Sequence, residues 1–341
     1  MTANTALDPA TVQQQATAFQ TAKLVLTGVE VGLFTALAGN PGTEAELSDR
    51  LGLHPRTARF FLDALTELGV LDRHGDRYAN SAAASTFLNA DADGYLGGFL
   101  AWADRVMYPA WGQLSTLLRT GKPPMAARDG HEMFAELWGD PERTELATRL
   151  AENISRPLIP SLMDVFDWAA YHSVVDLGGC RGDTVAELVR AYPHLDAVVF
   201  DLPAMREQFD EHMAELGAAT AGIRFQAGDF FADEIPHTDL LMINQALVDW
   251  DESQRRRLLE RTFPAVRPGG ALLICDPVIV EGEPSYFRNL VRGITMQLLT
   301  PGGGAHRLAE LTGWLHAAGY GEVEHRPLST DMSLVVAHKP A

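Results

Sequence analysis

The second half of the chain alternates short β-branched runs with segments of helical length, and this pattern constrains the fold more than any other feature. The apolar runs lie at 173–176, 197–201, 223–226, 240–243 and 271–275, with helix-length segments at 183–192, 204–216 and 252–266. Strands that alternate with helices require crossover connections. The pattern therefore predicts an α/β domain, with a mainly parallel sheet covered by helices on both faces.

Two further strands are expected near the carboxyl end, at Glu322 to Arg326 and at Met332 to Ala337. Only a short link, Pro327 to Thr330, separates these two strands. Such a link is too short for a parallel crossover, so we expect these two strands to pair antiparallel.

Up to Arg149 the pattern is helical, which predicts two domains, 1–150 and 151–341. Within the first, Thr43 and Glu46 have the spacing of a capping box that opens a short helix. A turn, a second helix over 56–68 and a hairpin across Gly75 complete a predicted helix-turn-helix with a small wing. We expect this helical winged domain to be a packing or dimerisation module.

Net charge argues against nucleic-acid partners. The chain carries 27 basic and 45 acidic residues, for a formal charge of -18, and phosphates would be repelled. The predicted winged helix is itself acidic, with five arginines against seven acidic residues over 44–80. A DNA-reading helix needs donors for phosphates and base edges, so we expect none here.

Targeting and metal signals are also weak. The two cysteines, Cys180 and Cys275, are too few for a disulfide framework or a zinc site. The amino-terminal residues lack the pattern of a secretory signal. The longest apolar run, 269–280, is shorter than the roughly 20 residues of a membrane span. We expect a cytoplasmic protein with no metal and no membrane partner.

Three successive strand ends carry residues suited to a nucleoside. A glycine-rich turn from Gly178 to Gly182 follows the first strand, Asp201 ends the second, and Asp229 with Phe230 follows the third. The turn lacks the G-x-G-x-x-G spacing of dinucleotide sites, and Asp183 would repel a pyrophosphate at the helix start. A carboxylate can instead accept hydrogen bonds from ribose hydroxyls. Each residue also has an ordinary structural explanation, but together they favour a nucleoside without excess negative charge.

At this point the chain resembles the plant-type (caffeate and hydroxyindole) O-methyltransferases. The motifs that carry the resemblance are at 174–183, 200–203, 228–231, 247–251, 267–271 and 300–303. Those at 108–112, 117–123 and 139–143 resemble bacterial secondary-metabolism members. The resemblance implies a class I methyltransferase (Rossmann-like) sheet of seven strands, S-adenosylmethionine as cofactor with S-adenosylhomocysteine as product, and a homodimer formed through the amino-terminal domain.

The resemblance also implies a set of cofactor-binding residues. By position, these residues are Gly178, Gly182, Asp201, Leu202, Asp229, Phe230, Asn244 and Ser155. Asn244 and Ser155 fall at the methionine end, and the two glycines line the methionine and ribose. Asp201 and Leu202 hold the ribose and adenosine, and the other two residues hold the adenine.

The family's general base is missing. The histidine of its Leu-His-Asp-Trp motif is replaced by Val248, and Ala305 stands where a supporting glutamate is expected. Three titratable residues remain as catalytic candidates: Asp249, Asp276 and His306. Asp249 could equally cap the next helix, and His306 could be an exposed residue at a helix start.

The acceptor is expected to be a small, flat aromatic molecule. Trp102, Tyr108, Met296 and Leu299 could line its site, or could equally be core or dimer contacts. Without the histidine, methyl transfer relies on alignment or on another base. Two alternatives stay open: a cofactor-retaining enzyme with a non-methylating reaction, and a winged-helix ligand-sensing regulator.

Overall fold

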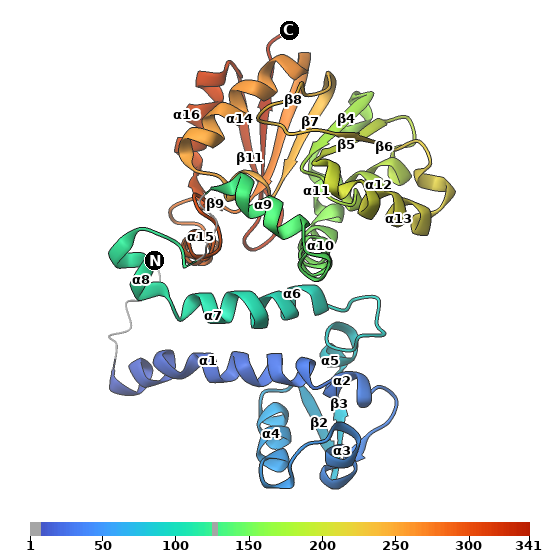
Figure 1. Ribbon diagram of the computed structural model, residues 1–341, viewed down its shortest axis with the longest axis vertical. Helices are drawn as coiled ribbons and strands as arrows, with labels where there is room; N and C mark the ends of the chain where they lie inside the picture. Colours follow the sequence, from blue (N-terminus) through green and yellow to red (C-terminus); the bar gives the residue numbers. More distant parts are fainter. Residues whose placement is uncertain (1–7, 125–128) are drawn as a thin grey trace. The chain divides into compact units, whose positions relative to one another are not determined.

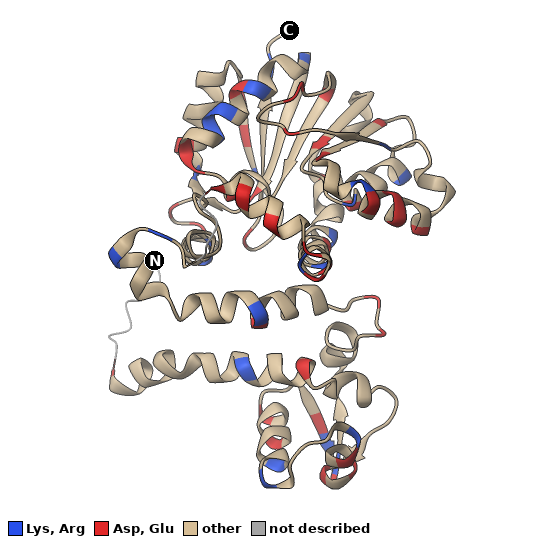
Figure 2. Cartoon of the chain, viewed as in Figure 1, with Lys and Arg blue, Asp and Glu red and all other residues tan. Residues whose placement is uncertain are grey.

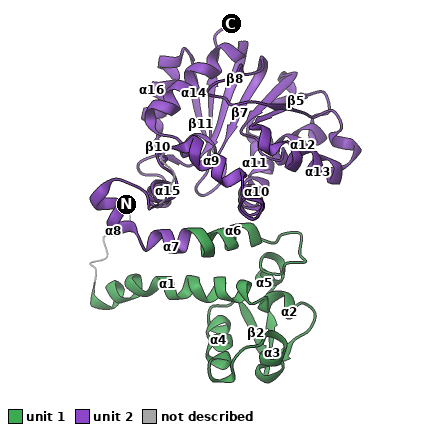
Figure 3. Cartoon of the chain, in the orientation of Figure 1, with its two compact units in different colours: residues 1–106 green, residues 107–341 purple. Residues whose placement is uncertain are grey.

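A computed structural model describes residues 8–124 and 129–341 of the chain. These residues fall into two units, Met1–Val106 and Met107–Ala341 (Figure 3). The boundary differs from the predicted division at residue 150, because the helices between 107 and 150 group with the sheet. A physical reason is visible in helix α9 (Gly130–Trp138), since Gly130 lies against the ring of Trp250 and Trp138 packs on the core of the second unit.

The second unit is built on the predicted sheet of seven strands. The strands are β4 (Ser173–Leu177), β5 (Asp196–Asp201), β6 (Arg224–Ala227), β7 (Thr238–Asn244), β8 (Val266–Asp276), β11 (Val323–Pro327) and β12 (Ser333–His338). Their order is β11-β12-β8-β7-β4-β5-β6. Strands β4 to β8 pair in parallel, whereas β12 pairs antiparallel with both β8 and β11. The predicted fold class and the antiparallel carboxyl-terminal pair are confirmed.

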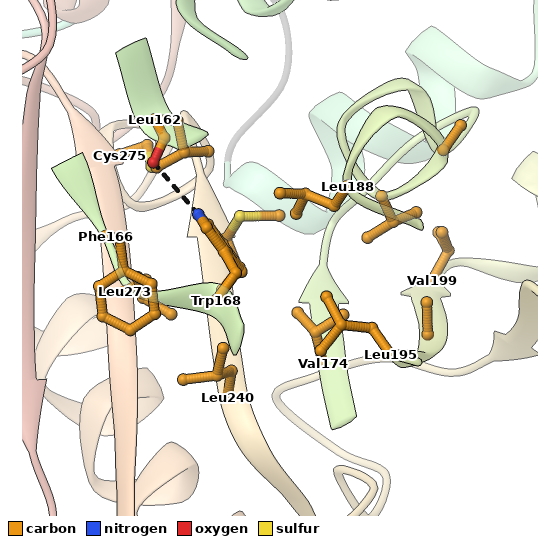
Figure 4. Close-up of a cluster of buried hydrophobic side chains, with 14 of the residues drawn as sticks. Leu162, Phe166, Trp168, Val174, Leu188, Leu195, Val199, Leu240, Leu273 and Cys275 are labelled. Atoms are coloured by element: carbon orange, nitrogen blue, oxygen red, sulfur yellow. Dashed lines mark hydrogen bonds between the residues drawn. The ribbon is translucent and has the colours of Figure 1, made fainter. Parts of the chain in front are cut away.

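Each face of this sheet has its own apolar core. Successive side chains of a strand point to opposite faces, so Val174 joins one core and Val175 the other. Helices α11 (Ile159–Val165), α12 (Asp183–Ala191) and α13 (Arg206–Leu216) cover the first face, and α14 (Glu252–Ala265) and α16 (Leu308–Ala318) cover the second (Figure 1). Trp168 is fully buried in the first core and donates its indole N–H to the Leu162 carbonyl at 3.2 Å (Figure 4).

The first unit contains the predicted winged helix. Its elements are α1 (Pro9–Glu30), α2 (Leu33–Ala36), α3 (Glu44–Leu51), α4 (Pro55–Glu67), α5 (Ala82–Phe87), α6 (Gly97–Trp102), and the strands β1 (Gly42–Thr43), β2 (Leu71–His74) and β3 (Arg77–Asn80). The capping box is present, since Thr43 Oγ1 accepts from the Glu46 N–H and Glu46 accepts from the Thr43 N–H. The wing is a three-stranded sheet rather than a hairpin alone, because β1 pairs with β3.

Arginines of the winged helix lie beside acidic residues (Figure 2). Four of the five take part in ion pairs: Arg50 and Arg77 with Glu46, and Arg59 and Arg73 with Asp63. These pairs neutralise the cationic side chains that a nucleic-acid surface would need to present.

Further elements of the second unit precede its sheet or link the strands of the sheet. They are α7 (Tyr108–Trp111), α8 (Leu114–Thr120), α10 (Pro141–Ser155), α15 (Tyr286–Leu299), the 3₁₀ turn η6 (Leu247–Asp249), and the short strands β9 (Val278–Ile279) and β10 (His306–Arg307). Among the described residues, no helix combines the length and apolar character needed to cross a bilayer.

Candidate functional site

The glycine-rich turn after β4 has a conformation that its glycines make possible. Gly178 has φ +70° and donates its N–H to the Phe200 carbonyl at 2.8 Å. Gly182, at φ +86°, begins α12. A Cβ at Gly182 would lie 3.2 Å from side-chain atoms of Val199 and Phe209. Positive φ and close packing both favour glycine, so the turn holds its backbone tightly at the carboxyl edge of the sheet.

Asp201 ends β5 directly beside this turn. Its buried carboxylate accepts the Cys180 N–H at Oδ2 (2.8 Å) and the Leu202 N–H at Oδ1 (2.7 Å). Burial raises the pKa of Asp201 to about 6, against the opposing effect of these two hydrogen bonds. A carboxylate offers about four acceptor positions. The geometry therefore fixes the carboxylate and leaves each oxygen further acceptor capacity, which suits a pair of ribose hydroxyls.

Asp229 and Phe230 follow β6 at the same edge. Asp229 Oδ1 accepts the Phe231 N–H at 2.8 Å, while its Oδ2 lies 3.7 Å from Nδ1 of His131. The half-buried ring of Phe230 meets that of Trp250 edge to face, with centroids 5.7 Å apart. One polar and one aromatic group thus adjoin Asp201, an arrangement that fits an adenine. His131 was not foreseen, because its position in α9 gives no sequence signal for contact with a residue almost a hundred positions away.

Asn244 and Ser155 lie on either side of Gln245. Asn244, at the end of β7, donates its side-chain amide to Thr184 Oγ1 at 3.0 Å. Gln245 donates to Ser155 Oγ at the end of α10 at 3.2 Å. The end of α10 is also tied to the glycine turn, because Arg181 donates to Glu152 at 2.5 Å. The structure therefore brings Ser155 and Asn244 to the same edge as the glycine turn.

Gln245 is a residue of this site that sequence reasoning missed. It has φ +56°, which is uncommon for a residue other than glycine, and its N–H donates to the Cys275 carbonyl at 2.9 Å. Its Oε1 accepts from Arg292 of α15 at 3.4 Å. The available signal was its place at the end of β7, directly after Asn244.

Asp249 is half-buried in η6, and within the described residues no hydrogen bond holds its carboxylate. The alternative that Asp249 caps the next helix is wrong, because Asp251 caps α14 by accepting the Gln254 N–H at 2.8 Å. Burial raises the pKa of Asp249 to about 7, opposed by the nearby charges of Arg255 and Arg292. A carboxyl with this pKa is partly ionised near neutral pH, so it can accept a proton as a general base must.

Asp276 and His306 lie deeper than Asp249. The carboxyl of Asp276 ends β8 with 0 % exposure, and Nε2 of His306 in β10 lies 3.8 Å from its Oδ2. His306 is 1 % exposed, so the alternative of an exposed histidine at a helix start is wrong. The reason is pairing of β10 with β9, which places His306 beside Val278 in the interior.

The four candidate acceptor residues are spread over both units. Trp102 belongs to α6 of the first unit, whereas Tyr108, Met296 and Leu299 belong to the second. Within the second unit, α7 with Tyr108 contacts α15, which carries Met296 and Leu299. All four side chains keep some exposed surface. Across residues 8–124 and 129–341, no group of three or more His, Cys, Asp and Glu side chains is placed to hold a metal ion.

Known proteins similar to this chain share both its units. The model of an O-methyltransferase domain matches residues 111–321, and that of an O-methyltransferase dimerisation domain matches residues 13–90. The tetracenomycin polyketide synthesis 8-O-methyl transferase TcmO of Streptomyces glaucescens is 38 % identical, with 97 % of each chain covered. The 3-hydroxy-5-methyl-1-naphthoate 3-O-methyltransferase of Streptomyces sahachiroi is 32 % identical over 92 % of this chain and 90 % of that one.

A solved structure has the same fold. Human N-acetylserotonin methyltransferase, crystallised in complex with S-adenosylmethionine, superposes with a TM-score of 0.89 at 22 % identity and 99 % coverage of both chains. At that identity the likeness concerns the fold. The two matching domain models, and the relative that aligns over nearly its whole length, show more than the fold. They show that the chain belongs to the family of S-adenosylmethionine-dependent O-methyltransferases.

Proposed function

We propose that this chain methylates a hydroxyl group of a small aromatic natural-product intermediate, with Asp249 taking the proton that the missing histidine would have taken. The observation that carries this proposal is the place of Asp249: a half-buried carboxyl beside Val248, in the turn η6 that follows the strand ending at Asn244. We further propose that the chain works as a homodimer, which the matched dimerisation domain supports.

The residues at the ends of β4, β5 and β6 fit the methyl donor. Gly178 and Gly182 would let the backbone approach it. Asp201 would accept hydrogen bonds from its ribose hydroxyls, with Leu202 alongside. Asp229 and Phe230 would hold its adenine, and Asn244 and Ser155 would hold its methionine end. When bound, S-adenosylmethionine supplies a methyl group on a positively charged sulfur, an already activated leaving group.

The acceptor side of the site is apolar and aromatic. We propose that Tyr108, Met296 and Leu299 of the second unit contact the acceptor's rings, which such side chains bind by stacking and area burial. The names of the relatives support an aromatic polyketide, since one acts in tetracenomycin synthesis and another on a hydroxynaphthoate. Hydroxyl groups on such rings are protonated at neutral pH, because a phenol has a pKa of about 10. They therefore benefit from a proton acceptor.

Asp249 can be that acceptor. With a pKa of about 7 it is largely ionised at slightly alkaline pH. Asp249 would accept the hydroxyl proton as the oxygen bonds to the methyl carbon and the bond from that carbon to sulfur breaks, so that S-adenosylhomocysteine would be the leaving group. General-base catalysis typically contributes about 10² to 10⁴ in rate. Orientation of the acceptor against the methyl group supplies the rest.

The test is an assay with purified protein, S-adenosylmethionine and a panel of hydroxynaphthoates and linear polycyclic phenols. We expect an acceptor to gain the mass of one CH₂ group, with S-adenosylhomocysteine formed in equal amount. A product of unchanged or lower mass, formed while S-adenosylmethionine survives, would instead establish the non-methylating alternative. Sedimentation of the same sample tests the homodimer, and a monomer at micromolar concentration would contradict it.

A further inference from the structure

Asp276 and His306 bury four polar atoms that no hydrogen bond satisfies. Both oxygens of Asp276 and both ring nitrogens of His306 lack a partner, and both side chains are fully buried. Buried polar groups are nearly always hydrogen-bonded, so such a group needs an explanation. Two of these atoms, Oδ2 of Asp276 and Nε2 of His306, lie 3.8 Å apart, which points to a proton on one side chain directed toward the other.

The charged groups facing this pair do not satisfy it. Arg255 of α14 directs its guanidinium to the carbonyls of Leu247 (3.1 Å), Val248 (3.3 Å) and Gly304. Arg292 of α15 contacts Gln245 and Asp331. Asp249 of η6 adds a second negative charge near Asp276. An ionised Asp276 would thus be a buried carboxylate with no hydrogen bond and a like charge nearby; the positive charges of Arg255 and Arg292 oppose this effect but rank below burial and Asp249.

Electrostatics favours the neutral form of both side chains. Burial, reinforced by Asp249, raises the pKa of Asp276 well above its usual value. Burial and the charge of Arg255 lower the pKa of His306 to about 3. A neutral carboxyl donates one proton and a neutral imidazole accepts at one nitrogen. The 3.8 Å from Oδ2 to Nε2 is slightly longer than a direct hydrogen bond, and it is short enough for the carboxyl proton to be directed at the imidazole nitrogen.

We propose that Asp276 and His306 form a neutral pair that retains one proton across the working pH range, which leaves Asp249 as the carboxyl that ionises and accepts the acceptor's proton. The pair consists of positioning residues, because it acts through Asp249 and has no exposed surface. Without the retained proton, Asp249 and Asp276 would both be carboxylates, and the negative charge of Asp276 would raise the pKa of Asp249 above neutral pH. The proposal rests on the proposed role of Asp249.

Infrared spectroscopy tests the retained proton without any acceptor or activity. In the folded wild-type protein at pH 7.5 we expect the C=O band of a protonated carboxyl, absent from the difference spectrum of the Asp276→Asn variant. His306→Leu should shift this band to higher frequency, because the carboxyl proton loses its partner, and His306→Gln should restore it. A wild-type spectrum without a protonated band that depends on Asp276 would overturn the proposal. If Asp276→Asn does not fold, the comparison of the two His306 variants still decides.

The pH profile of kcat then tests the link to Asp249. Asp276→Asn, which mimics the neutral acid, should lower kcat by less than about tenfold and keep the acid limb at its wild-type pH. If Asp276 had only a structural role, Asp276→Asn would lower kcat, but the band of a protonated carboxyl would not depend on Asp276. Loss of the acid limb in Asp276→Asn would show that Asp276 is the ionised carboxyl and overturn the proposal. If the band behaves as expected but Asp249→Asn keeps full activity, the retained proton stands and the proposed role of Asp249 falls.

Discussion

The two halves of the sheet's carboxyl edge are satisfied in different ways. At the ends of β5 and β6, the carboxylates accept backbone N–H groups: Asp201 from Cys180 in the glycine-rich turn and from Leu202, and Asp229 from Phe231. In η6 after β7 and at the end of β8, no hydrogen bond within the described residues holds the carboxyl of Asp249 or either oxygen of Asp276. In the proposed site, the methyl-donor half would therefore be held by backbone hydrogen bonds, whereas burial and neighbouring charges would govern the acids of the acceptor half.

This difference separates two tasks. A site whose carboxylates are fixed by the backbone binds one ligand in one orientation at little cost in ordering. A site whose carboxyls are desolvated has pKa values near neutrality, which suits proton transfer. The first half is typical of a binding site for a constant methyl donor, and the second of the place where chemistry on a variable acceptor occurs. The following experiments test whether the two halves are separable.

The largest effect is expected from Asp249→Asn. It removes the proton acceptor while keeping the side chain's shape, so kcat should fall by at least about a hundredfold, with the affinity for S-adenosylhomocysteine unchanged. Steady-state kinetics and calorimetric titration measure the two quantities. The matched control is Asp251→Asn, two residues along, because Asn also caps helices well. Equal loss in both variants would mean that the effect is structural.

Asp201→Ala should act on the other half alone. Loss of the ribose acceptor should weaken S-adenosylhomocysteine binding by at least about tenfold, or about 1.4 kcal/mol, as measured by calorimetry. Asp196→Ala is the control, since Asp196 begins the same strand and pairs with Arg224 on the surface. Unchanged affinity in Asp201→Ala would remove its assignment to the ribose.

Val248→His returns the residue that the resembling family uses as its base. A phenolic acceptor, once identified, should then react faster, by up to about tenfold, because a second proton acceptor joins Asp249. Val248→Ile serves as the control for a larger side chain at this buried position. A rate that does not rise in Val248→His would indicate that the acceptor arrives already ionised.

The pH dependence of binding should show the smallest effect. Asp201 has a pKa of about 6, so its carboxylate is ionised above that pH and becomes protonated below it. Affinity for S-adenosylhomocysteine should therefore fall by about fourfold from pH 7.5 to 5.5. Turnover should fall from a higher pH, near 7, as Asp249 takes a proton. If both quantities fell at the same pH, one group would govern both halves of the edge.

The fold of the sheet domain was predictable because its signals are local. Alternating apolar runs gave the parallel strands, and the short link after Pro327 gave the antiparallel pair. The domain boundary was not predictable, because the helices from 107 to 150 have the same periodicity whichever unit they pack against. The contact of Gly130 with Trp250 is a tertiary fact that no local pattern records.

The site divides in the same way. Strand ends in a parallel sheet meet at one edge, so the positions of Gly178, Asp201 and Asp229 followed from order along the chain. The burial of His306 did not, because it depends on β10 pairing with β9, which brings together His306 and Val278, 28 positions apart in the sequence. The role of Asp251 as helix cap likewise required the observed start of α14.

By itself the sequence determined the class of fold, the edge at which ligands bind and the absence of a histidine at position 248. Those properties depend on periodicity, strand order and residue identity, which are written along the chain. Only the tertiary structure decided which carboxyls are hydrogen-bonded and which are removed from water without a hydrogen bond. Desolvation is produced by residues distant in sequence, and it is desolvation that sets the proton affinity of Asp249, Asp276 and His306.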